Sequence, residues 1–360
     1  MRRYCLAILA GLAIAASLSI AGAQDYPARQ VTIIVPFAPG GSADIVARLY
    51  AQKLSERPGK PVVVENRPGA GTVVGSSAVA RAEPDGHTLL LGGSSALAYN
   101  VALHKALPYD PINDFVPLAH VSSIPFVLVV QPTLLVRSLS DLVRLAKDKP
   151  GQLAFGTSGI GSPAHLCAEY LRGMTGIDIT YIPYKGSAPA LTDFIAGQIP
   201  AMFVDLPPAL PLISEGKMRP LGMSLIAPVP AAPDIPPIAQ AGVPGYDAGG
   251  WHMFVAPAKT PKDTVNRLHS ELKRITALPD IQQRFTTLGL IAIDSPSVED
   301  LAIYVKSEID RWGKVIRAAG IAESSSATRH SSTTARKRRR REALKAKSSD
   351  PAGSHPGRNS

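Results

Sequence analysis

From residue 31 onward the chain alternates short apolar runs with amphipathic segments. The apolar runs are rich in β-branched residues and end in Gly, Pro or Ser turns, a pattern typical of strands in an α/β protein. We expect strands over 31–35, 62–64, 88–91, 126–130, 153–155, 201–204 and 221–225. We expect helices over 43–56, 140–148, 163–174, 187–197, 262–276 and 298–318. This order predicts an α/β fold with largely parallel sheets.

The N-terminal segment has the pattern of a secretory signal peptide. Arg2 and Arg3 precede an uncharged run from Cys5 to Ala23, whose last three residues form a small-residue cleavage site. We therefore predict a signal peptide over 1–23 and an exported protein. An uncleaved membrane anchor is the alternative, because an uncharged run of this length can just span a bilayer.

The C-terminal segment, 322–360, is dominated by Ser, Thr, Lys and Arg and contains an uninterrupted basic run from Arg336 to Arg341. Such a segment has too little apolar surface to fold, so we predict a disordered basic tail. We interpret it as non-essential, for example the product of read-through or a frameshift. An electrostatic role in the periplasm is the alternative.

Most of the net positive charge lies at the two ends of the chain. The net charge of +10 includes +7 from 322–360 and +2 from Arg2 and Arg3, which leaves +1 for 4–321. A nearly neutral body has no broad surface for a polyanion, so we exclude nucleic acid as a partner. The 360 residues, 45% of them hydrophobic, are enough for two folded domains that bind a small molecule.

Cysteine usage excludes a disulfide framework. Once the predicted signal peptide is removed, Cys167 is the one remaining cysteine, so no intramolecular disulfide can form. Cys167 lies in an apolar helical pattern. We predict that it is a small buried hydrophobic residue rather than a nucleophile.

The first candidate for chemistry is the turn between the first strand and the first long helix. Gly40 and Gly41 permit close approach of a ligand, Ser42 can cap the helix, and Asp44 lies in its first turn. The free N–H groups and positive dipole end of such a helix suit a carboxylate or a phosphate. An ordinary Gly-rich turn with a Ser cap is the alternative.

A second turn of the same kind covers Gly156 to Pro163. Ser162 is the expected N-cap and Pro163 the first helical residue. His165, in the first turn, either reaches a ligand or bonds to local backbone. A third polar turn, Gly92 to Ser95, adds hydroxyl groups. Two helix starts suited to anions, far apart in sequence, suggest one site held between two domains.

Known catalytic motifs are incomplete. The segment around Ser158 lacks the last glycine of G-x-S-x-G, and the chain has no G-x-x-x-x-G-K-[ST] phosphate loop and no complete dinucleotide fingerprint. The histidines show no i, i+4 pairing and no carboxylate partner at metal-ligand spacing. We predict no catalytic residue, no metal and no cofactor. An exported hydrolase using Ser158 or Ser162 with His165 is the alternative.

Seven segments of the chain resemble the Bug family, the periplasmic receptors of tripartite tricarboxylate transporters. They are Val35–Asp44, Val63–Gly71, Pro84–Leu90, Leu107–Pro111, Pro183–Gly186, Pro189–Asp193 and Phe254–Ala258. The resemblance follows the family's order from about residue 25 to 321, so it is far more specific than any one Gly-rich turn. The tail after Ile321 has no counterpart in the family.

The resemblance implies a two-domain periplasmic binding protein of the Venus-flytrap type (type II), with mostly parallel central sheets and no enzymatic activity. Domain I would comprise 24–127 and 251–321, and domain II 128–250. The ligand would be a small organic carboxylate, delivered to the permease subunits of a tripartite transporter by a protein that we expect to be monomeric. A sensor that acts on a membrane kinase is the alternative.

The resemblance also implies that backbone amides and small hydroxyl groups hold the ligand. The matching positions are Gly40, Gly41, Ser42, Asp44, Ser94, Ser95, Thr157, Ser158, Gly159, Gly161, Ser162 and His165, with Asp205 as a further cleft residue. Family members usually carry Thr just before the Asp of the first turn. This chain has Ala43 there, which makes ligand identity less transferable.

Overall fold

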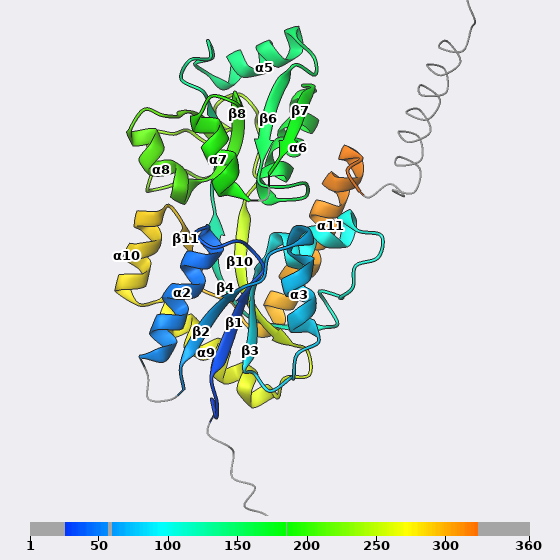
Figure 1. Ribbon diagram of the computed structural model, residues 1–360, viewed down its shortest axis with the longest axis vertical. Coiled ribbons are helices and arrows are strands. Elements are labelled where there is room, and N and C mark those ends of the chain that lie inside the picture. The colour runs from blue at the N-terminus through cyan, green and yellow to red at the C-terminus, as the bar shows by residue number, and fades with distance from the viewer. Residues whose placement is uncertain (1–25, 57–59, 185, 323–360) are drawn as a thin grey trace, which may run out of the picture.

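The computed structural model describes residues 26–56, 60–184 and 186–322. The predicted signal peptide lies outside the described residues, as does the basic tail apart from its first residue. Figure 1 shows two lobes stacked along the long axis of the molecule. Each lobe contains one β-sheet with helices against it, so the chain has the two-domain α/β architecture that we expected.

The lower lobe is built on a six-stranded sheet with the order β11-β4-β10-β3-β1-β2. Its strands are β1 (Val31–Val35), β2 (Val62–Asn66), β3 (Thr88–Gly93), β4 (Phe115–Ile124), β10 (Gly250–Pro257) and β11 (Ile291–Ala292). Its helical segments are α2 (Ser42–Ser55), η1 (Ala70–Thr72), α3 (Val73–Ala80), η2 (Ser95–Tyr99), α4 (Asn100–Leu103), α9 (Lys262–Thr276), α10 (Pro279–Leu288) and α11 (Val298–Ala319). We call this lobe domain I.

The upper lobe, domain II, is built on a five-stranded sheet with the order β7-β6-β8-β5-β9. Its strands are β5 (Phe126–Val130), β6 (Leu153–Thr157), β7 (Ile179–Pro183), β8 (Ala201–Asp205) and β9 (Arg219–Met223). Its helices are α5 (Leu139–Asp148), α6 (Pro163–Thr175), α7 (Ser187–Ile195) and α8 (Leu206–Ser214).

Both sheets are mixed, so the prediction of mostly parallel sheets was wrong. β1 is parallel to β2 and β3, and β6 is parallel to β7 and β8. In contrast, β10 is antiparallel to β3 and β4, and β5 is antiparallel to β8 and β9. The reason is the path of the chain: β4 and β5 carry it from domain I into domain II and β10 brings it back, so the crossing strands run in opposite directions. The sequence pattern missed β4, β7, β10 and β11.

The chain changes sheets over a very short distance on its way out. Ile124 ends β4 in the first sheet and Phe126 begins β5 in the second, with Pro125 between them. The return strand β10 begins at Gly250. The exact domain boundaries, 127/128 and 250/251, stay a prediction.

The cores explain the strands that the apolar pattern predicted. In domain I, β1 and β3 bury Ile33, Leu89 and Leu90 completely, and Tyr50 of α2 packs tilted on Phe254 with ring centroids 5.1 Å apart. In domain II, all five residues of β5 are buried. Cys167 is 1% exposed, as predicted. Burial of this kind is the main favourable term in folding.

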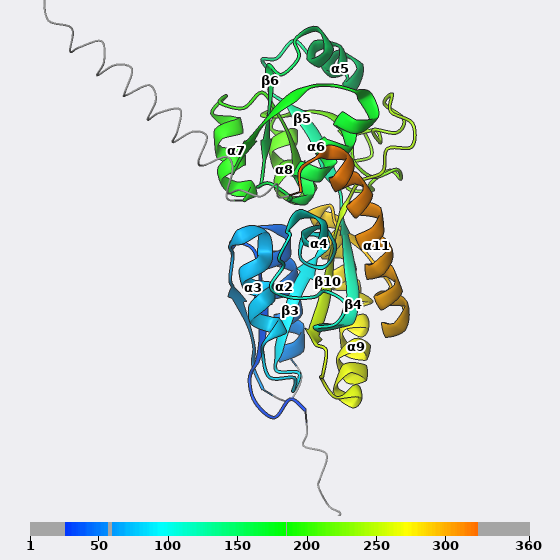
Figure 2. The same ribbon diagram turned by 90° about the vertical axis from the view of Figure 1, so that its right-hand side faces the viewer.

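The long helix α11 connects the two lobes. Figure 2 shows it running along domain I with its C-terminal end beside α6 of domain II. The Trp312 and Tyr170 rings lie edge to face at 6.2 Å, and Arg172 donates a hydrogen bond of 3.2 Å to the backbone oxygen of Ala319. Side-chain contacts as well as the crossing strands therefore join the two lobes.

Candidate functional site

The predicted anion-binding turns all follow parallel strands. β1 and β3 in domain I are parallel, and so are β6 and β8 in domain II. Each pair of C-terminal ends therefore lies at one edge of its sheet, which is where open α/β sheets bind their ligands. The two edges face each other: a Cβ added to Gly161, after β6, would lie 2.3 Å from Cδ1 of Leu103 in domain I.

The turn after β1 leaves the start of α2 uncapped by its own residues. Gly41 is the N-cap residue and has no side chain, while Ser42 is already the first helical residue. The expectation that Ser42 caps α2 was therefore wrong, because the chain reaches the helical conformation one residue earlier. A Cβ added to Gly40 or Gly41 would meet nothing within 4 Å. The Cβ positions of these two glycines thus border open space, while the first residues of α2, Ser42 and Ala43, are buried.

The Asp44 side chain forms hydrogen bonds that hold this turn in place. Its carboxylate accepts hydrogen bonds from the Gly40 N–H at 3.0 Å and from the side-chain amide of Asn66 at 2.9 Å. It also forms an ion pair of 2.9 Å with Arg48. Partial burial opposes ionisation, but the hydrogen bonds from Arg48, Gly40 and Asn66 outweigh it and lower the pKa of Asp44. Asp44 therefore holds the turn in place, and a direct ligand contact for it stays a prediction.

The turn after β6 is organised as expected at Ser162. Its hydroxyl oxygen accepts the His165 N–H at 3.2 Å as the N-cap of α6, and Pro163 is the first helical residue. The same turn places three other predicted residues together. The Gly159 N–H donates to Thr157 Oγ1 at 3.3 Å, and Ser158 between them is half-buried.

The His165 ring is buried inside domain II. Its Nδ1 accepts the Gly161 N–H at 3.1 Å, and the ring meets Tyr181 edge to face at 4.5 Å. Burial lowers its pKa to about 4, so the imidazole is neutral near pH 7. In the part of the chain that the structure describes, no hydrogen bond joins this ring to the hydroxyl of Ser158 or Ser162. A ligand contact for His165 stays a prediction.

A histidine and a carboxylate are paired on α6, although the sequence analysis expected no such pair. His165 and Glu169 are four residues apart on α6, with 3.7 Å between Nε2 and Oε1. The expectation that no histidine has a carboxylate at this spacing was therefore wrong, because an i, i+4 pair shares one helix face. Glu169 is also paired with Arg172 at 2.8 Å. Among the described residues, no group of three or more His, Cys, Asp or Glu side chains could hold a metal ion.

The turn after β3 contributes two buried serines. Ser94 is 1% exposed and Ser95 4% exposed, at the start of η2. Within the described ranges, the Ser95 hydroxyl has no hydrogen-bond partner. The preceding Gly93 is required by close packing, because a Cβ there would lie 2.1 Å from the backbone oxygen of Trp251.

Asp205 ends β8 of domain II and is buried. Burial raises the pKa of its carboxyl group, while Ser187 and, from domain I, Ser42 act in the opposite direction. The Ser187 hydroxyl also donates to Asp205 Oδ1 at 2.9 Å. The sequence analysis did not single out Ser187 and Leu103, which lie beside the predicted site residues Asp205 and Gly161. The Gly186-Ser187 helix start was the available signal for Ser187.

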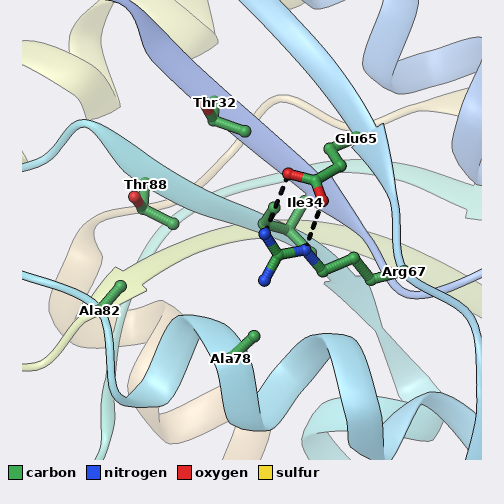
Figure 3. Close-up of a pocket in the computed structure, with 7 residues that line it drawn as sticks. All are labelled: Thr32, Ile34, Glu65, Arg67, Ala78, Ala82 and Thr88. Carbon is green, nitrogen blue, oxygen red and sulfur yellow. Dashed lines mark hydrogen bonds and ion pairs between the residues drawn. The ribbon is translucent and has the colours of Figure 1, made fainter.

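A separate pocket of about 240 Å³ lies between α3 and the sheet of domain I. Figure 3 shows it, with the 2.6 Å ion pair between Glu65 and Arg67 at one side. The other lining residues are Thr32, Ile34, Ala78, Ala82 and Thr88. None of the predicted ligand-binding residues lines this pocket.

Comparison with known proteins agrees with this architecture. The family model described as the tripartite tricarboxylate transporter family receptor matches residues 46–321. Protein BugT of Bordetella pertussis is 37% identical over 313 residues, covering 87% of this chain and 95% of BugT.

Two solved structures are similar in fold and sequence. An R. palustris protein with adipate, Rpa4515, has a TM-score of 0.79 at 37% identity, covering 83% of this chain and 99% of that one. MatC from Rhodopseudomonas palustris with bound malate has a TM-score of 0.75 at 33% identity, covering 81% and 100%.

Two α/β domains that meet at the C-terminal ends of their parallel strands, with these structural relatives, define a two-domain periplasmic binding protein. Within that class, the chain belongs to the tripartite tricarboxylate transporter receptor family, the Bug family. This is a family of solute-binding receptors. Among the described residues, no helix is both long and apolar enough to cross a membrane.

Proposed function

We propose that this protein is a periplasmic receptor that captures a small organic carboxylate between its two domains and delivers it to a tripartite tricarboxylate-type membrane transporter. The observation that carries the proposal is the start of α2, where the N-cap Gly41 makes no side-chain cap bond and the Cβ positions of Gly40 and Gly41 border open space. A helix N-terminus of this kind stabilises an anion through its N–H groups and its dipole.

The opposite side of the cleft supplies complementary polar groups. Domain II contributes the turn after β6, with Thr157 and Ser158, and domain I adds the buried hydroxyl of Ser95. A ligand that contacts both sides stabilises the closed arrangement over the open one. The relatives support a carboxylate as the ligand class, since one solved structure contains adipate and another malate.

The direct test is ligand binding by the full chain, unfolded and refolded beforehand to remove any retained ligand. Thermal shift and calorimetry would compare malate, adipate and citrate with the corresponding amides. The comparison separates recognition of the carboxylate charge from recognition of the shape of the ligand. A carboxylate at about 100 times its dissociation constant adds roughly 2.7 kcal/mol to stability, or several degrees in Tm. Amides that bind as well as the acids would refute the carboxylate site.

A matched pair of glycine variants locates the site. Gly41→Val places a side chain in the open space at the start of α2, and Gly173→Val places one at an exposed position on α6 where a Cβ meets nothing within 4 Å. We expect loss of carboxylate binding in Gly41→Val and retention in Gly173→Val. Equal binding by both variants would place the ligand elsewhere.

Delivery to a transporter is tested in cells. Uptake of the identified carboxylate should require both this chain and the permease subunits. If removal of the permease leaves uptake unchanged, the chain serves another membrane partner, such as the sensor kinase of the alternative hypothesis.

A further inference from the structure

Three polar side chains on α6 connect the turn after β6 with the contact to domain I. His165, Glu169 and Arg172 follow one another at intervals of four and three residues, so they share one face of the helix. His165 and Glu169 are buried, with 1% and 3% of their surface exposed, and Arg172 is half-buried. A buried carboxylate is costly unless its charge is balanced, so the partners of Glu169 decide what this face of α6 can do.

The hydrogen bond from Gly161 assigns the tautomer of the His165 ring. Because Nδ1 accepts the Gly161 N–H at 3.1 Å, its lone pair is free of a proton and the proton of the neutral ring lies on Nε2. Nε2 is 3.7 Å from Oε1 of Glu169. The ring is therefore placed with its acceptor toward the turn and its N–H toward the carboxylate.

A second proton on this ring would break its contact with the turn. The proton would have to bind Nδ1, and two N–H groups would then face each other between His165 and Gly161. The turn is tight at this point, because Gly161 has φ +75° and the Ser162 N–H donates to the Gly159 oxygen at 3.1 Å. The shape of the turn therefore depends on an unprotonated Nδ1.

Glu169 favours the second proton and Arg172 opposes it. A carboxylate close to an imidazole stabilises the charged form of the ring. The Arg172 guanidinium binds the same carboxylate, with Nε and Nη2 both 2.8 Å from Oε2. Burial lowers the pKa of His165, and the charge of Arg172 lowers it further. Two further titratable groups act on these side chains: Tyr181, whose ring meets His165 edge to face, and Asp178, whose charge acts on Arg172.

Domain I holds the Arg172 side chain in this position. Nη2 of Arg172 donates a hydrogen bond of 3.2 Å to the backbone oxygen of Ala319, the last residue of α11, and Figure 2 shows this end of α11 beside α6. The last carbonyl groups of a helix have no partner within it and form the negative end of its dipole, so they attract a guanidinium. The charge that balances Glu169 is therefore anchored on the other domain.

We propose that Arg172 is a positioning residue of the ligand site: anchored on α11, it balances the charge of Glu169, so that His165 keeps an unprotonated Nδ1 for the Gly161 N–H and the turn keeps its shape. This inference rests on the proposed function, because that turn is one side of the proposed carboxylate site. Loss of the Arg172 charge should change the protonation of His165 first and the affinity for a ligand as a result.

Arg172→Met tests the proposal, because it keeps the length of the side chain and removes its charge. NMR titration of the full chain follows the His165 ring, whose signal is assigned by its absence in His165→Gln, and hydrogen exchange follows the Gly161 N–H. We expect the pKa of His165 to rise to about 5.5 and the Gly161 N–H to exchange faster in mild acid. Affinity for malate or adipate should match that of the original chain at pH 7.5 and be about fourfold weaker at pH 5.

Two comparison variants isolate the charge of Arg172. Combining Arg172→Met with Glu169→Gln removes both charges, so the pKa of His165 should fall back to about 4 and the affinity at pH 5 should recover. Arg144→Met, on α5 at the top of domain II in Figure 1, removes an arginine that is also paired with a carboxylate three residues away, Asp141 at 2.6 Å. We expect this variant to change neither quantity.

An unchanged pKa of His165 in Arg172→Met would overturn the proposal, and so would a raised pKa with unchanged affinity at pH 5. An affinity loss that Glu169→Gln does not reverse would mean that Arg172 acts in another way. Arg172→Gln, which retains an N–H donor, gives the same test if thermal unfolding shows that Arg172→Met is not folded. The pKa of His165 and the exchange of Gly161 are measured without ligand. If both change as expected but the original chain binds no carboxylate, the proposed function is wrong and the effect of Arg172 on the turn stands.

Discussion

The carboxylate of Asp44 accepts a hydrogen bond of 3.0 Å from the backbone N–H of Gly40, four residues earlier in the chain. This contact closes the turn before α2 on itself. It also uses the Gly40 N–H, so the groups of this turn that remain for a ligand lie at Gly41 and at the first residues of α2.

Asp44→Ala should therefore weaken ligand binding through the turn rather than through a lost ligand contact. We expect about tenfold lower carboxylate affinity together with a stability loss of roughly 1 to 2 kcal/mol, since Gly40, Arg48 and Asn66 all lose an acceptor. Calorimetry and urea unfolding give the two quantities. Asp44→Asn keeps an acceptor oxygen and should lose less of both. A large affinity loss with no stability loss would instead indicate a direct ligand contact.

Gly161→Ala should disturb domain closure, and a matched control isolates the cause. Gly161 has φ +75°, and its new Cβ would lie 2.3 Å from Leu103; Gly176 has φ +69° but no atom within 4 Å of the added Cβ. Both alanine variants should lose about 1 kcal/mol from the left-handed backbone. Only Gly161→Ala should also lower ligand affinity.

Adding Leu103→Ala to Gly161→Ala tests the same contact from the other domain. Removing the Leu103 side chain relieves the clash but not the backbone strain. We expect calorimetry to show ligand affinity restored, while the stability loss remains. If affinity stays low in the double variant, the effect of Gly161→Ala comes from the turn itself.

Buried histidines should make the protein less stable in mild acid. Burial lowers the pKa of His120 to about 4, against about 6.5 in the unfolded chain. The contribution of the neutral His120 ring to the free energy of unfolding is fully present above pH 6.5. It is lost as the pH falls from about 6.5 to 4, because over this range the histidine of the unfolded chain takes up a proton before the buried one does. The loss at pH 4 is about 3 kcal/mol for this one residue.

Urea unfolding at pH 7 and pH 5 measures this effect, with His120→Gln as the comparison. The variant should show a shallower loss of stability between the two pH values, whatever its stability at pH 7. His269, whose Nδ1 lies 2.7 Å from the Leu118 oxygen but which is only partly buried, provides a control position. An identical slope in His120→Gln and the original chain would contradict the prediction.

Glu308 should be important for stability because its carboxylate accepts hydrogen bonds from two indole N–H groups. Its Oε2 accepts from Trp251 Nε1 at 2.9 Å and from Trp312 Nε1 at 3.1 Å, and the residue is 6% exposed. Glu308→Ala should cost about 2 to 4 kcal/mol, since both buried N–H groups lose their acceptor. Glu308→Gln keeps an oxygen and should cost about 1 kcal/mol. Urea unfolding followed by tryptophan fluorescence measures both, and equal losses in the two variants would argue against the hydrogen bonds.

The elements that local signals define were predictable. Apolar runs bounded by turns gave β1, β5 and β8 within a residue or two, and the Ser162-Pro163 pair gave the start of α6. The pattern missed β4, β7, β10 and the two-residue β11, although β4 and β10 are largely buried. β4 and β10 pair with each other although they are distant in sequence. An apolar run contains no information on whether a strand pairs parallel or antiparallel, so the mixed sheets could not be predicted from the apolar pattern.

The residue types along the chain were enough to indicate the family, the α/β fold and the turns at the strand ends, because these leave local signals: glycines where the backbone turns, Ser-Pro where α6 begins, and apolar runs where strands are buried. What each polar side chain contacts became visible in the folded molecule alone. There Asp44 accepts from Gly40, His165 packs against Tyr181, and Asp205 accepts from Ser187. The contacts of His165 and Asp205 depend on how helices and strands that are distant along the chain pack together, and no local pattern of residues encodes that packing.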